Sequence, residues 1–164
     1  MRPAGFTVWV TGSDPRALPP VADAIAERLA ARHVEVEVLG DRSPGFNALG
    51  GEVVERRVTY VAGLLRRHGI STVIALSATP AVRAQARTEL GQMIEVHVRA
   101  AADTAPPEPT EVEIVVPEPS PGGGAERTLR TLEVLQLLPP VEDRGYSEEE
   151  EREVIKRLKD FGYL

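Results

Sequence analysis

The chain has 164 residues, a formal net charge of −6 and no cysteine. The acidic charge argues against a nucleic-acid-binding surface, and the absence of cysteine excludes disulfides, thiolate nucleophiles and cysteine-ligated zinc. Because the sequence has no run of ~18 apolar residues and no signal-peptide pattern at its start, we expect a cytoplasmic protein without a membrane span.

Strand-like and helical patterns alternate along the first half of the chain. Residues 6–10 form a short apolar run that predicts a buried parallel strand, and residues 21–31 repeat apolar side chains at helical spacing. The alternation VEVEVL at residues 34–39 predicts a strand that has one exposed face or lies at a sheet edge. Residues 40–51, which include four glycines, predict a loop.

The same alternation continues in the second half. Residues 52–68 predict a helix that ends before Gly69, and the apolar run STVIAL at residues 71–76 predicts the central strand. A final helix is predicted to begin at Ser147, which forms a capping box with Glu150. The other predicted elements are an arginine-rich helix at 81–90, strands at 93–98 and 111–116, a proline-containing loop at 99–110, a break at 117–124 and a helix at 125–138.

Repeated β-α-β-α order predicts a three-layer α/β fold, with a parallel sheet of about five strands and helices on both faces. Ligands of such folds bind beyond the carboxyl ends of the strands, which brings residues 12–20, 40–51 and 77–87 around one crevice. We expect one domain at residues 1–138, followed by a proline hinge and an amphipathic helical tail at residues 139–164.

Several segments, in the right order, carry a resemblance to a known family. They are GFTVWVTG at 5–12, VADAIAERL at 21–29, VEVEVLGD at 34–41, ERRVTYVAGLLRRHGISTVIALSATP at 55–80 and IEVHV at 94–98, with the closing strand and helix up to residue 138. The chain resembles adenylylsulfate kinase, the P-loop enzyme that phosphorylates the 3′-hydroxyl of adenylylsulfate with ATP. This resemblance implies a P-loop-kinase-like fold.

The phosphate-binding loop departs from the family pattern Gly-x-Ser-Gly-x-Gly-Lys-Ser/Thr. In that pattern the glycines turn backbone N–H groups around the phosphates, the lysine pairs with them and the hydroxyl binds Mg²⁺. Aligned without gaps, only the first glycine remains, as Gly12, while the lysine position holds Leu18. Prolines, which have no N–H, stand at two further positions of the motif, and alanine replaces the third glycine: Pro15, Pro19 and Ala17.

Other positions are compared with the family one by one. The Asp-Gly-Asp turn reads Leu39-Gly40-Asp41, so its first aspartate is missing. The resemblance matches the family's arginine pair that contacts adenylylsulfate with Arg56 and Arg57, whereas the asparagine near that pair falls on Val54. The long basic lid after the fourth strand is absent, because residues 100–110 join that strand to the next. The resemblance leaves a candidate crevice for a nucleotide or sulfonucleotide, formed by Gly12, Arg16, Asp41, Arg56, Arg57 and Arg83.

Each of these residues also has a plain structural interpretation. Gly12 would equally be explained by a turn after a strand. Arg56 and Arg57 would equally be explained by a helix face exposed to solvent. Arg83 and Arg87, four residues apart on one helix face, would either hold an anion or pair with Glu89 and neighbouring acids. The three histidines show no metal-ligand spacing, and we predict no metal, no cofactor and no catalytic residue.

The predicted last helix carries an apolar stripe that continues to the final residue. This stripe would pack on the chain's own domain, or dock on a partner or a second copy as an amphipathic helix in a groove. Its residues, assigned here as a partner-docking helix, are Val154, Ile155, Leu158, Phe161, Tyr163 and Leu164.

The main hypothesis is an adenylylsulfate-kinase-like protein that is inactive as a kinase. It would serve as a regulatory or scaffolding subunit linked to sulfur or sulfonucleotide metabolism, with a sulfonucleotide as ligand and a homo-oligomer or protein partner bound through the last helix. Two alternatives stay open: an active transferase that phosphorylates adenylylsulfate through an atypical loop, and a structural interaction module that acts through the last helix. None of these predicts binding to nucleic acid or to a membrane.

Overall fold

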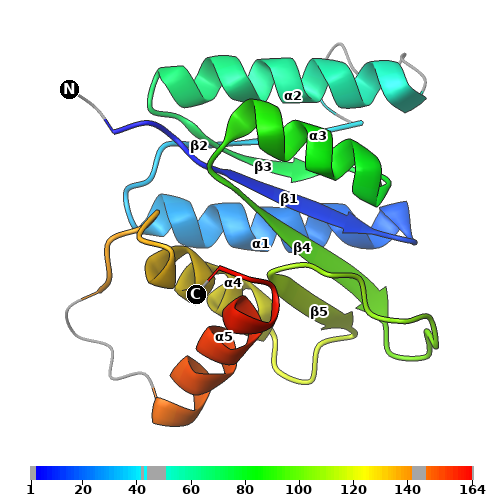
Figure 1. The fold of residues 1–164 in the computed structure, drawn as a ribbon, viewed down its shortest axis with the longest axis vertical. Helices are drawn as coiled ribbons and strands as arrows, with labels where there is room; N and C mark the ends of the chain where they lie inside the picture. Colours follow the sequence, from blue (N-terminus) through cyan, green and yellow to red (C-terminus); the bar gives the residue numbers. More distant parts are fainter. Residues whose placement is uncertain (1–2, 42, 44–50, 142–146, 164) are drawn as a thin grey trace.

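The computed structural model describes residues 3–41, 43, 51–141 and 147–163 of the chain (Figure 1). Five parallel strands form one sheet in the order β2-β3-β1-β4-β5. The strands are β1 (Thr7–Gly12), β2 (Val36–Gly40), β3 (Ser71–Ala75), β4 (Met93–Ala100) and β5 (Val112–Val116). The predicted parallel sheet is confirmed, and each strand end lies within two residues of its predicted position.

Helices cover both faces of the sheet. They are the short 3-10 helix η1 (Pro15–Ala17), α1 (Leu18–Ala31), α2 (Gly51–Arg67), α3 (Pro80–Leu90), α4 (Gly123–Val134) and α5 (Glu148–Asp160). The helix predicted at 125–138 ends earlier, because Gln136 has a left-handed backbone conformation (φ 60°) that turns the chain. The predicted loop 40–51 lies mostly outside the described residues. Within the described part of the chain, no helix is long and apolar enough to cross a membrane.

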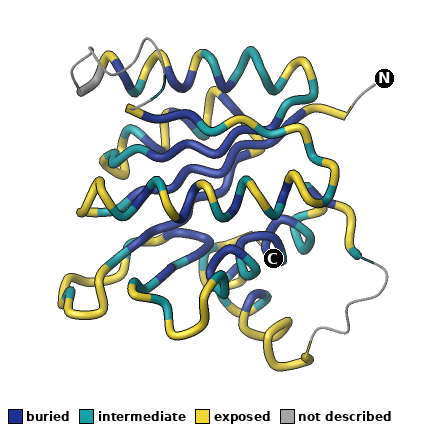
Figure 2. The backbone as a smooth tube through the Cα atoms, turned by 180° about the vertical axis from the view of Figure 1, so that it is seen from behind, coloured by how far each residue is buried: buried dark blue, intermediate teal, exposed yellow. Residues whose placement is uncertain are grey.

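Two apolar cores lie on opposite faces of the sheet. Alternation along β1 sends Val8 and Val10 to the core beneath α1 and α4, whereas Trp9 belongs to the core beneath α2 and α3. Figure 2 shows the strands as the buried layer, with the outer turns of the helices exposed. Because all five strands are parallel, their carboxyl ends lie at one edge of the sheet, which is the edge of the predicted crevice.

The last helix, α5, packs on the rest of the chain. Its residues Val154 and Leu158 are buried, at 5% and 0% exposure, and α5 contacts α4. Polar contacts add to this packing: Arg130 pairs with Glu150 at 2.9 Å, and the Arg157 Nε donates to the Thr110 carbonyl at 3.0 Å. The packing of the tail on its own chain, one of the two predicted arrangements, is therefore observed for the buried part of the stripe.

A partner can reach only part of the predicted docking stripe. The chain itself covers Val154 and Leu158, so these two side chains are not available at the surface. Ile155 and Phe161 are half-buried and Tyr163 is 39% exposed. Leu164 lies outside the described residues.

Candidate functional site

The segment after β1 folds as a compact turn. Asp14 caps η1: its carboxylate accepts a hydrogen bond from the Arg16 backbone N–H at 3.0 Å, and its carbonyl accepts one from the Ala17 N–H at 3.1 Å. The Arg16 side chain, 91% exposed, pairs with the same carboxylate at 3.2 Å. These bonds lower the pKa of Asp14, with the side-chain bond from Arg16 as the largest cause. The N–H groups of Arg16 and Ala17 are thus already bound by the chain itself.

Leu18 begins α1 and points into the protein. It is 1% exposed and belongs to the core beneath α1 and α4. Its Cδ2 atom lies 3.2 Å from the position that a β-carbon on Gly12 would take. The side chain at this position therefore fills the space between the start of α1 and the end of β1.

Gly12 is needed where β1 passes β4. A β-carbon on Gly12 would lie 2.3 Å from the Val98 carbonyl oxygen, a distance that no ordinary contact allows. The Gly12 carbonyl also accepts a hydrogen bond from the Ser77 hydroxyl at 2.6 Å. Close packing of β1 against β4 is thus a sufficient reason for this glycine, rather than the turn after a strand that its plain interpretation predicted.

We expect Gly12→Ala to lower the free energy of unfolding by roughly 1–3 kcal/mol, because the new methyl group must displace backbone. Gly63→Ala is the matched control. It lies inside α2, where its β-carbon would have an ordinary 3.7 Å contact with Leu90, and helix propensity predicts a gain of roughly 0.5–1 kcal/mol. Urea denaturation of both variants measures this; equal effects would contradict the role of strand packing.

The connection from β3 to α3 is tied to the end of β1. The Trp9 indole Nε1 donates to the Leu76 carbonyl at 2.9 Å, and the Thr11 hydroxyl accepts from the Ala78 N–H at 3.2 Å. Together with the bond from Ser77 to Gly12, these contacts hold residues 76–78 across the end of the strand. The polar groups at this point of the predicted crevice are therefore largely satisfied within the chain.

The end of β2 opens onto a cavity of about 350 Å³. Leu39 is buried at 8% exposure in the core beneath α2, whereas Asp41 is exposed. The described lining has two carboxylates, from Asp23 and Asp41, and no basic side chain. Its residues are Pro19, Asp23, Val38, Leu39, Gly40, Asp41, Ser43 and Ala75.

The predicted arginines do not converge on this cavity. Arg56 and Arg57 are exposed on α2, and Arg56 lines a separate hollow of about 80 Å³ between α2 and α3, together with Glu55 and Glu89. Arg83 is 1% exposed. The six predicted crevice residues therefore lie in different environments and do not line one common cavity.

Arg83 is held by acids inside the protein. Its Nε donates to Glu95 of β4 at 2.6 Å, while its two terminal nitrogens donate to Glu108 and to the Ala78 carbonyl. The guanidinium therefore points to β4 and to the segment before β5. Of the two interpretations of Arg83, pairing with acids is the one observed, although its partners are Glu95 and Glu108 rather than Glu89.

A second arginine extends this buried cluster to the end of the chain. Arg87 pairs with Glu95 and Glu111 and contacts Tyr163, whose ring centre lies 5.8 Å from the guanidinium carbon and whose hydroxyl donates to Glu111. Burial opposes the charge of Arg87, but Glu111 and Glu95 outweigh burial and hold the pKa of Arg87 above its usual value. The sequence pattern does not reveal this cluster, because its members are far apart along the chain.

The cluster should make stability depend on pH in alkaline solution. Burial, followed by the hydrogen bond to Glu111, raises the pKa of the Tyr163 phenol, so the folded protein keeps a proton that the unfolded chain loses above about pH 10. The free energy of unfolding should therefore fall as the pH rises above about 10. Urea denaturation from about pH 8 to about pH 11 tests this; a Tyr163→Phe variant with an unchanged fall would contradict it.

Comparison with known proteins identifies the family. A family model for adenylylsulphate kinase matches residues 4–108. The chain belongs to the adenylylsulfate kinase family. A probable adenylyl-sulfate kinase of Pyrococcus abyssi is 31% identical over 98% of this chain and 98% of its own length. The adenylyl-sulfate kinase of Gloeothece citriformis is 30% identical over 61% of this chain and 62% of its own length.

A solved structure supports the same assignment. An adenylylsulfate kinase of Mycobacterium tuberculosis aligns with a TM-score of 0.64 and 26% identity, over 80% of this chain and 99% of that one. This likeness agrees with the strand order and layers described above. The chain spans about three fifths of the length of the Gloeothece relative, and nearly the whole length of the Pyrococcus relative.

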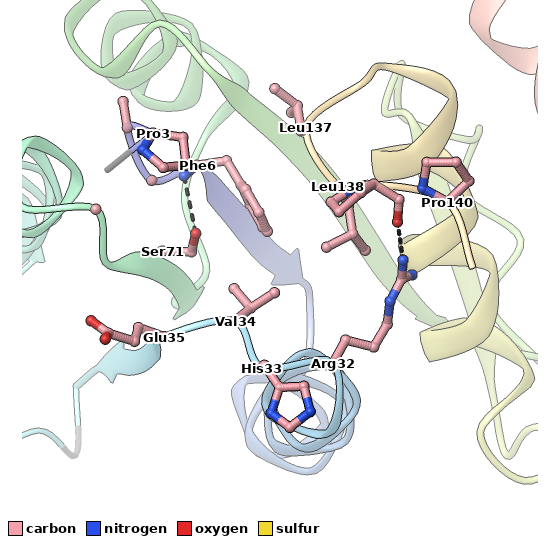
Figure 3. Close-up of a pocket in the computed structure, with 14 residues that line it drawn as sticks. Pro3, Phe6, Arg32, His33, Val34, Glu35, Ser71, Leu137, Leu138 and Pro140 are labelled. Carbon is pink, nitrogen blue, oxygen red and sulfur yellow. Dashed lines mark hydrogen bonds between the residues drawn. The ribbon is translucent and has the colours of Figure 1, made fainter. Parts of the chain in front are cut away.

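Another cavity of this adenylylsulfate kinase family member lies at the opposite, amino edge of the sheet (Figure 3). It measures about 470 Å³, more than the cavity beside Asp41, but none of the six predicted crevice residues lines it. The Arg32 guanidinium crosses one side and donates to the Pro139 carbonyl, and the Phe6 N–H donates to Ser71 at 3.2 Å. Because parallel α/β folds bind ligands beyond the carboxyl ends, we place the candidate site at the Asp41 edge despite its smaller cavity.

Proposed function

We propose that this member of the adenylylsulfate kinase family does not transfer a phosphoryl group from ATP. It serves instead as a regulatory or scaffolding subunit linked to sulfonucleotide metabolism. The observation that supports this most directly is the burial of Leu18, at 1% exposure, at the position that the family motif gives to its phosphate-binding lysine. An inward leucine contributes neither charge nor a hydrogen bond to a phosphate.

The chemistry of the reaction makes this loss severe. Phosphoryl transfer depends almost wholly on positioning and on stabilising the charge of the transferred group. Here the carboxylate of Asp14 accepts the Arg16 N–H, so an acid of the chain occupies a donor that a phosphate would need. A second negative charge at this turn would be repelled by Asp14, and the exposed Arg16 is already paired with it.

The proposed sulfonucleotide binding uses those predicted crevice residues that remain at the surface, although they line separate hollows. Asp41 and Arg56 are both at the surface and match family positions in the sequence. Arg83 would be available to an anionic ligand only after Glu108 moves, since Glu108 holds one end of its guanidinium. With a side chain 34% exposed, Glu108 is the member of this cluster that an incoming anion would displace.

A working transferase is the second candidate. It is favoured by the full-length match to the Pyrococcus protein, whose name describes it as a probable adenylyl-sulfate kinase. In that case the nucleotide would have to bind without the usual lysine. Asp41, the remaining aspartate of the motif, would have to orient the substrate hydroxyl in place of the first aspartate, which is Leu39 here.

Calorimetry with Mg²⁺-ATP, with adenylylsulfate and with its 3′-phosphorylated form tests the proposal. We expect no binding of ATP, binding of a sulfonucleotide, and no ADP formation when both substrates are supplied. Arg56→Gln should weaken sulfonucleotide binding, and Arg152→Gln, a surface change on α5, is the matched control. Binding of none of the three would instead favour the structural interaction module.

One outcome would overturn the proposal. It is Mg²⁺-dependent ADP formation approaching the ~1–100 s⁻¹ of kinases, lost in Asp41→Asn. The loss in the variant separates activity of this chain from that of a contaminating kinase.

A further inference from the structure

The last helix and the residues after it are held to the rest of the chain by few apolar contacts. We define the C-terminal strap as residues 147–163, which include α5. The buried residues of α5 are Val154 and Leu158. Two cavities of about 290 Å³ each lie between the strap and the domain, one beside Val154 and one beside Arg157. Because elements with few buried contacts open at a lower free energy than the core, the strap should open before the sheet unfolds.

The closed strap binds the connection between β4 and β5 at the point where this connection enters β5. The Arg157 Nε donates to the Thr110 carbonyl at 3.0 Å. The Tyr163 hydroxyl donates to the carboxylate of Glu111. Figure 1 shows α5 at the β5 end of the sheet, where these contacts are made. Since Thr110 and Glu111 are both buried and directly precede β5, the strap fixes the last two residues of the connection.

The same connection carries an acid that covers Arg83. The Thr110 N–H donates to the Glu108 carbonyl at 2.9 Å, which couples the positions of these two residues. The Glu108 carboxylate pairs with a terminal nitrogen of Arg83. Contacts therefore run without interruption from the strap, through Thr110 and Glu108, to the guanidinium of Arg83.

Charge shows which acid of this cluster a ligand can replace. Two guanidiniums, those of Arg83 and Arg87, pair with three carboxylates, those of Glu95, Glu108 and Glu111. A further anion is therefore repelled while Glu108 is in place, whereas the charges balance once Glu108 has moved away. Glu95 and Glu111 are buried, but Glu108 is half-buried. A ligand anion would consequently take the place of Glu108 rather than that of the other two acids.

We propose that the C-terminal strap is an autoinhibitory latch on Arg83. While the strap is closed, its contacts with Thr110 and Glu111 keep Glu108 on the guanidinium. When the strap opens, the connection moves, Glu108 leaves, and an anionic group of a ligand pairs with Arg83 in its place. The part that concerns a ligand rests on the sulfonucleotide binding proposed above, whereas the opening of the strap and of the connection does not depend on it.

Thiol labelling of the full chain tests the latch without a ligand. The parent has no cysteine, so one reporter can be placed at a time. Val154→Cys reports on the strap, Thr110→Cys on the connection, and Val96→Cys, at a buried position of β4, on the sheet. The first two should react at similar rates, at least about tenfold faster than the third, because the rate follows the fraction of molecules in which each position is open. Melting temperatures show that each variant is folded.

Three labelling results would overturn the latch. If Val154→Cys reacted as slowly as Val96→Cys, the strap would not open by itself. If Thr110→Cys reacted as slowly as Val96→Cys, the connection would stay closed while the strap opens. If Thr110→Cys reacted much faster than Val154→Cys, the connection would open without the strap.

Weakening the packing of the strap should open both positions together. Leu158→Ala removes a buried side chain of α5 and should speed the labelling of Val154→Cys and of Thr110→Cys by the same factor, at least about tenfold. Arg152→Met changes a largely exposed residue of the same helix and should alter neither rate. Faster labelling at the strap alone would contradict the coupling to the connection.

Calorimetry with adenylylsulfate tests the inhibitory role. Leu158→Ala should bind it roughly tenfold more tightly than the parent, because the apparent affinity is reduced by the fraction of molecules that are closed. Arg152→Met should bind as the parent does. Glu108→Gln should also bind more tightly, and its combination with Leu158→Ala should gain less binding free energy than the sum of the two, since both changes remove the same carboxylate from Arg83.

The outcomes separate the latch from the proposed function. Equal affinity of the parent, Leu158→Ala and Glu108→Gln would contradict the inhibitory role and leave sulfonucleotide binding standing. Binding by none of them would overturn the sulfonucleotide ligand together with the inhibitory role. Fully additive gains would show that the strap and Glu108 act on the ligand by separate routes, which would also overturn the latch.

Discussion

Replacing Leu18 with lysine should destabilise the protein by on the order of 5 kcal/mol and should not create ATP binding. The side chain at this position is 1% exposed within an apolar core. A lysine at this buried position must either lose its proton or move its ammonium group to solvent. A pKa shift of several units corresponds to a free energy of this size. Urea denaturation and calorimetry with Mg²⁺-ATP measure the two parts of the prediction.

Leu18→Met is the matched control for this substitution. It keeps the volume and polarity of the site, and such changes usually cost less than about 1.5 kcal/mol. If Leu18→Lys kept normal stability and bound ATP, the side chain would have to reach solvent at the crevice. That result would contradict both the buried position and the proposed loss of kinase activity.

Arg83→Met should lower the free energy of unfolding by up to roughly 3–5 kcal/mol, because it removes one of the two arginines that pair with the buried carboxylate of Glu95 and leaves only Arg87. Arg83 and Glu95 are 1% and 8% exposed, so water replaces the lost contact poorly. The loss should also loosen the segment before β5, since Glu108 binds the same guanidinium.

Arg152→Met removes the arginine of a surface pair and serves as the control. Arg152 pairs with Glu148 at 3.3 Å, and both side chains are largely exposed. Exposed pairs of this kind contribute little, so denaturation curves of the parent and of Arg152→Met should nearly coincide. If the two arginine variants lost equal stability, burial of the Arg83 cluster could not be the cause.

The strands could be predicted closely because their signal is local. The run of residues 71–76 predicts a buried strand from its own side chains alone, without distant residues. The observed strand β3 ends one residue earlier. Helix α4 was harder, because Leu137 and Leu138 continue the apolar pattern after the backbone has turned at Gln136. Periodicity reports which side chains are buried, and it does not report that the helix has already ended.

The candidate site could be predicted only in part, because its decisive contacts join distant residues. The motif shows that Leu18 replaces a lysine, but only packing shows that its side chain fills the core. Arg83 reaches Glu108 across 25 residues, and Arg87 reaches Tyr163 across 76. The charges alone allowed these arginines to hold either an anion or an acid, and only three-dimensional placement decides between the two.

Two arginines bind backbone carbonyls in or near β5, at the edge where the sheet could add another strand. β5 is an edge strand, and such edges attract further strands through their free backbone groups. Arg127 of α4 donates to the Glu113 carbonyl at 3.0 Å, and Arg157 of α5 donates to the Thr110 carbonyl just before the strand. Arg127 thus occupies a carbonyl of β5 itself, and Arg157 occupies one just before the strand. Shortening the chain before α5 would remove only the Arg157 donor and would leave the start of this edge more open to pairing with a strand from another molecule.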